Sequence, residues 1–268
     1  MSASSKGTAV VTGASAGIGA IYADRLARRG YDLILVARTQ ARLDQVANRI
    51  AGATGRAVKS VAADLNDKAD LKRVETILAT VPGVTMLVNN AGVGALAPLL
   101  QSDIGAMEQM IDLNVTALTR LSYAAAPAFV ARGGGAIINI SSVVAVAPEV
   151  LNGVYGASKA FVLALSQSLH KELADKNVRI QVVLPGATAT NFWDNAGGAV
   201  ENLPSATVMQ SDDLVDAALA GFDQGELVTI PSLPAAADWF AYEGARQNLI
   251  PNLSRNSVPP RYRSAVAA

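Results

Sequence analysis

The stretch Thr12-Gly13-Ala14-Ser15-Ala16-Gly17-Ile18-Gly19 decides the fold of this chain. It follows the apolar run Thr8–Thr12, and a segment of helical period begins at Gly17. Glycines let a backbone turn tightly and approach a pyrophosphate, while the free N–H groups at the start of a helix attract negative charge. The stretch therefore predicts a strand–turn–helix unit that binds nucleotide phosphates, although its glycine spacing differs from the GxGxxG fingerprint. The predicted phosphate contacts are Gly13, Ser15, Ala16, Gly17, Ile18 and Gly19.

The same turn allows a second interpretation. Gly13-Ala14-Ser15-Ala16-Gly17 also fits G-x-S-x-G, the nucleophile elbow of α/β-hydrolases, with Ser15 as the nucleophile. That chemistry requires a histidine, and the chain has one, His170, within a predicted long helix. A structural or surface role is expected for a histidine there, so the hydrolase stays open as the second hypothesis.

Beyond the turn, short apolar runs alternate with longer segments of helical period, which is typical of a parallel sheet covered by helices. The expected strands are Thr8–Thr12, Asp32–Ala37, Ala57–Ala62, Thr85–Asn89, Ala136–Ser141, Arg179–Leu184 and Leu227–Ile230. The expected helices lie near 17–29, 40–51, 67–80, 104–131, 154–174 and 211–222. The pattern predicts an α/β fold with a Rossmann-like, doubly wound parallel sheet of about seven strands and helices on both faces.

No linker or internal repeat divides the sequence, so we expect one dinucleotide-binding domain over residues 1–268. Residues 187–210 mix Gly, Asn, Pro and two aromatic residues without clean periodicity, which predicts a mobile substrate-covering loop. Residues 231–268 hold five of the eleven prolines and are expected to form a C-terminal extension.

Composition excludes several kinds of function. The 268 residues carry 22 basic and 22 acidic side chains, so no overall field favours nucleic acid or an anionic membrane. The chain has no cysteine, and no His/Asp/Glu grouping predicts a metal site. It begins with no recognisable signal peptide and contains no membrane-length apolar run, so we expect a soluble, cytoplasmic protein that binds a small ligand.

The segment Tyr155-Gly156-Ala157-Ser158-Lys159 carries the strongest chemical signal. Its i, i+4 spacing places Tyr155 and Lys159 on one face of a helix. A tyrosine with a reference pKa of about 10 is a poor base at neutral pH, and a nearby cation stabilises its phenolate. The pair therefore predicts a proton-transferring tyrosine assisted by a lysine.

Together these features resemble the short-chain dehydrogenase/reductase family over roughly residues 7–230. The turn at residues 12–19 is similar to the TGxxxGxG motif of the family, and Tyr155 to Lys159 is similar to its YxxxK motif. The resemblance implies that Lys159 also binds the ribose of the nicotinamide. It implies three further groups of cofactor contacts: Asp64 and Leu65 at the adenine, Asn90, Ala91 and Gly92 beside the adenosine, and Pro185, Gly186, Thr188 and Thr190 on the nicotinamide side.

The resemblance also implies two more catalytic residues. Ser142 stands thirteen residues before Tyr155, the spacing of the family's serine that orients the substrate oxygen; its neighbour Ser141 is the competing candidate. Asn114 matches an asparagine that holds a water between the lysine and solvent, although a purely structural buried amide is the alternative. The family further implies a homodimer or homotetramer built by the helices near 104–131 and 154–174.

Arg38 selects between the two nicotinamide cofactors. It ends the second predicted strand, where NAD-binding folds place an acidic residue on the ribose 2′-hydroxyl. A carboxylate would repel a 2′-phosphate, whereas a guanidinium binds it through several donors. Arg38 therefore favours NADP(H), with a solvated strand-end charge as the alternative.

These observations predict an NADP(H)-dependent oxidoreductase that transfers hydride between the nicotinamide and a carbonyl or secondary alcohol. A non-catalytic, NADP-sensing protein on the same fold is a further alternative. The sequence leaves the substrate open, beyond favouring a small apolar carbonyl or alcohol. Phe192 and Trp193 either line its pocket or pack structurally, and Leu96–Leu99 and Ala145–Asn152 are the other segments expected to cover it.

Overall fold

A computed structural model of the chain describes residues 6–263, and the chain divides after Ser232 into two compact units. The first unit contains the whole sheet and the site described below. The second unit begins near residue 231, where the sequence predicts a C-terminal extension. The two units are therefore described separately.

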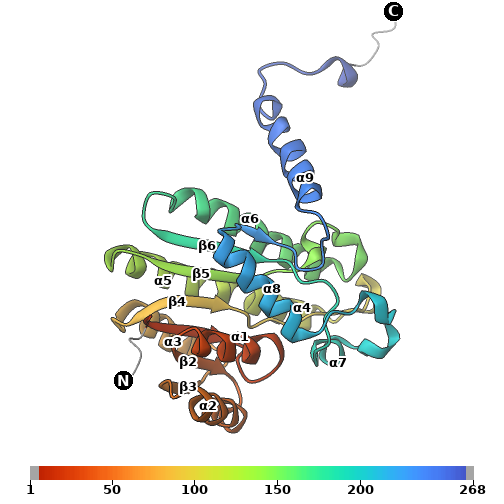
Figure 1. Cartoon of the computed structure of the whole chain (residues 1–268). Helices are drawn as coiled ribbons and strands as arrows, with labels where there is room; N and C mark the ends of the chain where they lie inside the picture. The colour runs from red at the N-terminus through yellow and green to blue at the C-terminus, as the bar shows by residue number, and fades with distance from the viewer. Residues whose placement is uncertain (1–5, 264–268) are drawn as a thin grey trace, which may run out of the picture. The chain divides into compact units, whose positions relative to one another are not determined.

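The first unit is built on a seven-stranded sheet in the order β3-β2-β1-β4-β5-β6-β7, in which every pairing is parallel (Figure 1). Its strands are β1 (Thr8–Thr12), β2 (Asp32–Ala37), β3 (Val58–Ala62), β4 (Val84–Asn89), β5 (Gly135–Ile140), β6 (Val178–Val183) and β7 (Val228–Thr229). Apolar residues continue through both pleats because helices cover both faces of the sheet. This confirms the predicted doubly wound fold.

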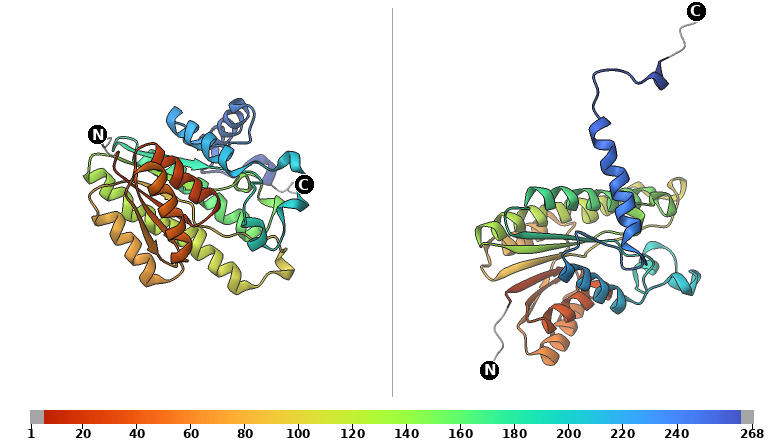
Figure 2. Two further views of the ribbon diagram at one scale, coloured as in Figure 1. Left: turned by 60° about the horizontal axis from the view of Figure 1, so that its bottom comes forward. Right: turned by 45° about the horizontal axis from the view of Figure 1, so that its top comes forward.

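Two hydrophobic cores lie on opposite faces of the sheet, and helices pack on both sides of the strands (Figure 2). Within β1, Ala9 and Val11 belong to one core and Val10 to the other, since successive side chains of a strand point to opposite faces. The first core is completed by α1 (Gly17–Arg28), α2 (Gln40–Thr54) and α8 (Ser211–Gln224). The second is completed by α3 (Lys68–Thr80), α5 (Leu118–Ala131) and α6 (Gly153–Glu172).

The single helix expected over 104–131 consists of three segments. They are α4 (Ile104–Ile111), a π-helical stretch over Asp112–Ala117, and α5. A π-helical turn is wider than an α-helical one and occurs frequently at functional sites. Here it contains Asn114, whose side chain is buried.

The predicted irregular loop at 187–210 contains regular segments. A short helix, α7 (Phe192–Ala196), is followed by two 3₁₀ turns, Val200–Asn202 and Ser205–Thr207. The base of the loop is closed by a parallel bridge between Thr188 and Met209. This bridge holds the two ends of the loop next to each other, between β6 and α8.

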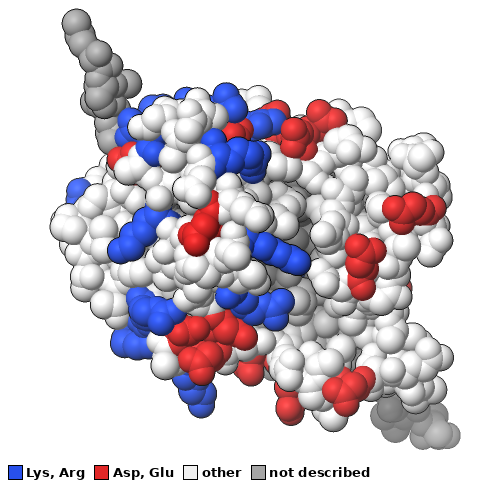
Figure 3. All heavy atoms as spheres, turned by 90° about the horizontal axis from the view of Figure 1, so that it is seen from below, with Lys and Arg blue, Asp and Glu red and all other residues white. Residues whose placement is uncertain are grey.

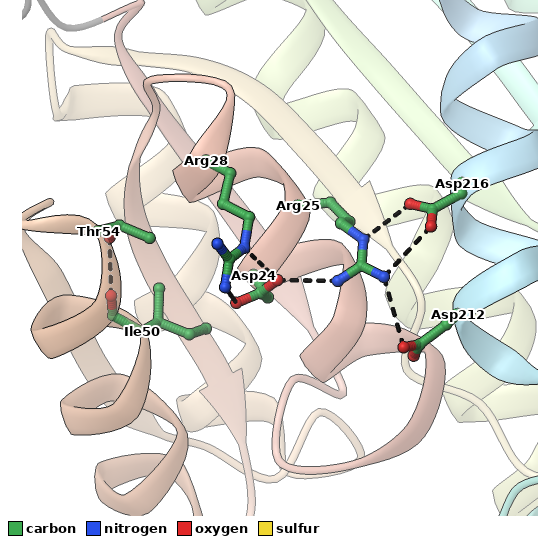
Figure 4. Close-up of polar contacts among 7 residues, drawn as sticks. All are labelled: Asp24, Arg25, Arg28, Ile50, Thr54, Asp212 and Asp216. Carbon is green, nitrogen blue, oxygen red and sulfur yellow. Dashed lines mark hydrogen bonds and ion pairs between the residues drawn. The ribbon is translucent and has the colours of Figure 1, made fainter.

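An ionic cluster joins α1 to α8 (Figure 4). Arg25 of α1 binds Asp216 of α8 at 2.7 Å and approaches Asp212 at 3.4 Å. Arg25 and Arg28 both bind Asp24 at 2.9 Å. α1 begins at the glycine-rich turn, and α8 begins where the 187–210 segment ends. These contacts therefore link the helix that follows the turn to the helix that follows the segment.

The second unit contains α9 (Ala236–Leu249) and two 3₁₀ turns, Ile250–Asn252 and Pro260–Tyr262. Within α9 the rings of Trp239 and Tyr242 lie 5.3 Å apart, and Glu243 binds Arg246 at 2.6 Å. This helix lies in the predicted C-terminal extension, for which no helix was expected. Over residues 6–263, no helix combines the length and the apolar character that crossing a bilayer requires.

The surface charge is balanced locally as well as overall. On the face shown in Figure 3, Lys and Arg side chains are interspersed with Asp and Glu on the left of the view. The right of the view is mostly uncharged, with scattered acidic side chains. This face therefore presents no extended field of one sign.

Candidate active site

The glycine-rich turn lies where the strand order of the sheet reverses. β1 pairs with β2 on one side and β4 on the other, and ligands of open α/β sheets bind outside the strand ends at such a switch point. Thr12 joins the two strand ends, because its hydroxyl oxygen accepts from the N–H groups of Asn90 and Ala91, each at 3.0 Å. The Asn90 amide donates back to the Thr12 carbonyl at 2.9 Å.

The backbone of the turn requires its glycines. Gly13 and Gly17 have φ angles of +65° and +52°, in the left-handed region that favours glycine. A Cβ at Gly19 would lie 2.5 Å from the carbonyl oxygen of Gly13. The N-cap of α1, Ala16, offers no side-chain hydrogen bond to the first N–H groups of the helix. These donors are thus left for an anion, as a phosphate-binding helix start requires.

A cavity of about 470 Å³ opens beside this turn and continues to Tyr155. Most of the predicted site residues line it: Gly13, Ser15, Ala16, Gly17, Ile18, Asn90, Ala91, Gly92, Ser142, Tyr155, Lys159, Pro185, Gly186, Thr188, Thr190, Phe192 and Trp193. Five predicted residues are not in its lining: Gly19, Arg38, Asp64, Leu65 and Asn114. The fold thus brings residues from four strand ends and from α6 around one space.

Tyr155 lies in the first turn of α6 and is 6% exposed. Asn152 caps this helix, since its side-chain oxygen accepts from the N–H groups of Val154 and Tyr155 at 2.9 and 3.2 Å. Burial raises the pKa of the Tyr155 phenol to about 12, and a hydrogen bond with Ser142 offsets part of that rise. The net shift is opposite to the one expected from pairing with Lys159, so the phenol is protonated at neutral pH in this form.

Lys159 is 7% exposed, and its ammonium group lies 5.8 Å from the centre of the Tyr155 ring. It donates to the carbonyl of Ile140, the last residue of β5, at 3.0 Å. Burial lowers the pKa of Lys159 to about 8, because desolvation disfavours the charged form. The amine therefore titrates close to physiological pH.

The structure distinguishes Ser142 from Ser141. The Ser141 hydroxyl donates to the backbone carbonyl of Lys159 at 2.7 Å and so holds α6 against β5. The Ser142 hydroxyl makes two long hydrogen bonds, donating to the carbonyl of Pro185 at 3.4 Å and accepting from Val144 N at 3.3 Å, and it also interacts with the phenol of Tyr155. Ser142 is thus the serine placed to share an oxygen atom with Tyr155, in keeping with its thirteen-residue spacing.

Asn114 supports the site from behind. Its amide donates to Val93 O at 2.8 Å and to Ser158 Oγ at 3.1 Å, while its oxygen accepts from Val93 N at 3.0 Å. A Cβ at Gly92 would lie 3.1 Å from the Asn114 oxygen and 3.4 Å from the Lys159 nitrogen. Gly92 therefore lets both polar groups approach the same point, while the water between them implied by the resemblance stays a prediction.

The residues predicted to bind the adenosine half of a cofactor lie at the same edge of the sheet. Arg38 follows β2 directly; it is exposed and forms no salt bridge with any residue between 6 and 263. Asp64 and Leu65 follow β3; the Asp64 carboxylate accepts from Asn66 N at 3.0 Å, and Leu65 is buried in the second core. Their contacts with a nucleotide stay a prediction.

His170 does not belong to this site. It is exposed in the last turn of α6, whereas Tyr155 in the first turn lines the cavity. The fifteen residues between them span roughly 22 Å of helix at 1.5 Å per residue. Ser15, which lines the cavity, therefore has no histidine in the lining to serve as its base. The geometry does not support the hydrolase hypothesis.

The cavity lining around Tyr155 is largely apolar and aromatic, although the cavity is also lined by Asn191 and Asn195. The Phe192 ring lies 5.6 Å from that of Tyr155 and meets the Trp193 ring edge-on at 5.5 Å. The Trp193 indole N–H donates to Thr188 O at 2.9 Å. The lining here also includes residues that sequence reasoning did not name individually: Val143, Val144, Val150, Leu151 and Leu203.

Sequence reasoning also missed Asn152, which is 5% exposed. Besides capping α6, its amide donates to Ala97 O at 2.6 Å and to Ser102 Oγ at 3.1 Å. An asparagine just before a predicted helix is a readable N-cap signal, but its second set of partners depends on the tertiary fold. In the described part of the chain, no group of three or more His, Cys, Asp or Glu residues is placed to hold a metal ion.

A doubly wound parallel sheet, a phosphate cradle at its switch point and a buried tyrosine–lysine–serine cluster define a dinucleotide-binding protein of the Rossmann class. Sequence comparison then identifies the family. A model of the family described as short chain dehydrogenase matches residues 7–200, and the chain belongs to that family.

Two solved structures are similar over nearly the whole chain. A short-chain dehydrogenase from Sphingobium yanoikuyae in complex with NADPH is 50% identical, covers 96% of this chain and 100% of its own, and has a TM-score of 0.92. A bulky-bulky ketone specific alcohol dehydrogenase from Comamonas testosteroni is 43% identical, covers 97% and 99%, and has a TM-score of 0.89. The family assignment therefore rests on fold and sequence together.

Among curated proteins, a very-long-chain 3-oxoacyl-CoA reductase from Anas platyrhynchos is 36% identical over 190 residues, or 69% of this chain. The chain spans about 60% of the length of the first curated relatives it matches.

Proposed function

We propose that this chain is an NADP(H)-dependent oxidoreductase that interconverts a carbonyl and a secondary alcohol, with Tyr155 as the proton-transferring residue. The observation that carries the proposal is the single cavity shared by the glycine-rich turn, Ser142, Tyr155 and Lys159. In that arrangement the phosphate cradle and the proton donor lie at two ends of one space, as hydride and proton transfer to one substrate require.

The residues present fit NADP(H). The uncapped start of α1 and the glycine backbone fit a pyrophosphate, and Lys159 lies where it can hold ribose hydroxyls. Arg38, exposed at the end of β2 and without a carboxylate partner among the described residues, would bind the 2′-phosphate. The complex of the Sphingobium relative with NADPH supports this assignment. When bound, the cofactor supplies or accepts the hydride.

The residues of the chain transfer the proton and bind the substrate oxygen. In the reductive direction Tyr155 Oη gives its proton to the substrate carbonyl oxygen as the carbon is reduced, and the phenol of pKa about 12 is protonated and ready to donate. The Ser142 hydroxyl donates a hydrogen bond to the same oxygen and stabilises the charge that develops there. The ammonium group of Lys159 favours the phenolate that Tyr155 becomes.

For the substrate we infer a small apolar ketone, aldehyde or secondary alcohol. Val144, Leu151 and Phe192 pack in one apolar cluster with Tyr155, and the cavity lining, which also includes Asn191 and Asn195, is mostly apolar there. An apolar wall favours apolar groups flanking the carbonyl because their burial is favourable. The ketone specificity named for the Comamonas relative supports the same class.

Replacing Tyr155 tests this function. Tyr155→Phe removes the hydroxyl but keeps the ring, so we expect turnover to fall by at least about 10²-fold, the scale of one general acid. The affinity for NADPH should stay nearly unchanged. Consumption of NADPH across a panel of carbonyl compounds measures the first, and fluorescence titration measures the second. Full activity in the variant overturns the assignment, and NADPH binding without turnover in the parent favours a sensor.

Arg38 provides the test of cofactor choice. Arg38→Gln removes the charge while keeping a shorter polar side chain, so we expect kcat/KM with NADPH to fall about tenfold or more. The value with NADH should change little, because that cofactor lacks the 2′-phosphate. Equal effects on both cofactors, or a parent that prefers NADH, would contradict the role of Arg38.

A further inference from the structure

We propose that Gly94 is a specificity-determining residue: the Phe192 ring packs directly on it, and this contact limits the size of the substrate group that fits beside Tyr155. The inference rests on the proposed function and goes beyond it, since it concerns how the shape of the pocket is fixed. Gly94 follows the Asn90–Gly92 segment and precedes the first 3₁₀ turn, Leu99–Gln101.

The contact between Gly94 and Phe192 leaves no room for a side chain. A Cβ at Gly94 would overlap Cζ of Phe192 and lie 2.6 Å from its Cε2 and 3.3 Å from its Cε1. The three nearest atoms all belong to this one ring. Gly94 is not among the glycines with positive φ, so its backbone conformation is open to alanine. The glycine is therefore required by the ring and not by the backbone.

Phe192 is partly buried, and two aromatic side chains pack against its ring. Its ring lies 5.6 Å from that of Tyr155 and meets Trp193 edge-on at 5.5 Å. Trp193 is itself only 8% exposed and is held by its hydrogen bond to Thr188 O. A ring pushed away from Gly94 therefore either presses on these two neighbouring rings or moves into the cavity that it lines.

The segment that carries Gly94 is held on both sides and has little freedom to yield. Both backbone groups of Val93 are bound by the Asn114 side chain at 2.8 and 3.0 Å. Further along, Leu96 N donates to Ala196 O at 3.1 Å, and Ala97 O accepts from Asn152 at 2.6 Å. A clash at Gly94 is therefore relieved by the aromatic ring, the far end of a rotatable side chain, and not by the backbone.

The kinetic consequence concerns substrate size. With Gly94→Ala the ring moves into the cavity next to the catalytic hydroxyl, so a ketone with a long second substituent loses more than a ketone with a methyl group. With Phe192→Ala the wall is removed and the long ketone is no longer penalised. In the double variant the new methyl group has nothing to displace, so it should behave like Phe192→Ala.

The experiment compares kcat/KM of the full chain for acetophenone and valerophenone with NADPH. Gly94→Ala should lower the valerophenone-to-acetophenone ratio about tenfold, a size discrimination that an apolar pocket can supply. Adding Gly94→Ala to Phe192→Ala should leave the ratio unchanged. The matched control is Gly52→Ala in α2, where a Cβ meets no atom within 4 Å and the ratio should stay at the parent value.

Two results overturn the proposal: equal losses on both ketones in Gly94→Ala, or the same loss whether or not Phe192 is present. If the parent reduces neither ketone, Gly94 is judged by calorimetric titration of the NADPH complex with both compounds, and the proposed function itself fails only if no carbonyl compound of the panel is reduced. If Gly94→Ala binds valerophenone more weakly but acetophenone as the parent does, the proposed role of Gly94 is supported. If it binds both compounds as the parent does, the proposal is overturned.

Discussion

Tyr155 and Lys159 have pKa values shifted in opposite directions by the same cause. Both side chains are more than nine-tenths buried, and desolvation disfavours whichever form is charged. The phenol therefore keeps its proton to about pH 12, and the amine loses its proton near pH 8. In this pair the lysine, and not the tyrosine, is the group that titrates in the working range.

This difference predicts the pH dependence of reduction. Lys159 is charged below about pH 8 and neutral above it, so kcat/KM for a ketone should fall as the pH rises through about 8. In Lys159→Met the rate should be low and should no longer fall near that pH. Initial rates between pH 6 and 10 at fixed ionic strength measure both profiles, and a decline that persists in the variant contradicts the assignment.

Stability gives an independent check on Lys159. Its pKa is lower in the folded chain than the ordinary value of 10.5, so the unfolded chain binds the proton more tightly. The resulting contribution to stability is fully present above pH 10.5 and is lost as the pH falls through about 8. Urea unfolding should show this pH dependence in the parent, and it should be weaker in Lys159→Met.

At the scale of elements, α1 and α8 are joined by charged contacts of unequal burial. Arg25 is 26% exposed and binds Asp24, which is 10% exposed, together with Asp216. Burial of Asp24 acts to raise its pKa, but hydrogen bonds from Arg28 and Arg25 outweigh this and hold the pKa below its usual range. The Arg29–Asp223 pair also joins α1 to α8, yet both partners are more exposed, at 34% and 59%.

The two arginines therefore predict unequal losses of stability. Arg25→Met should lower the free energy of unfolding by about 1–3 kcal/mol, because Asp24 keeps only Arg28 as a partner while remaining mostly buried. Arg29→Met, the matched control, should change it by less than about 1 kcal/mol, the usual value of an exposed pair. Urea titrations at pH 7 measure both, and equal losses would contradict this reading of the cluster.

The sequence predicted elements best where one local pattern decides the structure. The strands of the sheet were expected within a residue or two, because β-branched apolar runs bounded by turns have few alternatives. The i, i+4 spacing of Tyr155 and Lys159 predicted that they share one helix face, and the resemblance pointed to Ser142; all three line one cavity, while their catalytic roles stay predictions. The features that were predicted wrongly or missed depend on tertiary contacts. The π-helical turn around Asn114, for example, was predicted as part of a continuous α-helix.

Gly94 and Asn152 show the same limit at the site. Nothing in the residues next to Gly94 indicates that an aromatic ring 98 positions later will lie on it. The cap formed by Asn152 was readable, whereas its bonds to Ala97 and Ser102 depend on a loop brought close by the fold. The predicted sign of the Tyr155 pKa shift was wrong because burial cannot be read from a YxxxK spacing.

At the scale of the whole molecule we propose that the chain forms a homodimer or homotetramer through α5 and α6. Large side chains on both helices support this, since Tyr123 and Phe161 are 61% and 39% exposed. A charge introduced there should separate the copies, so Phe161→Glu is expected to lower the mass measured by light scattering. Leu100→Glu, at a residue 95% exposed outside both helices, is the control. A parent of single-chain mass contradicts the proposal.

The strand order also has a consequence for folding during synthesis on the ribosome. β1 is central in the sheet, yet its second neighbour, β4, begins 72 residues after β1 ends. When β1, β2 and β3 have been synthesised they can pair, but β1 is then an open edge with unpaired N–H and C=O groups. Until Val84–Asn89 emerges, that edge is exposed to other nascent chains, and this is the interval in which a chaperone would protect the chain most.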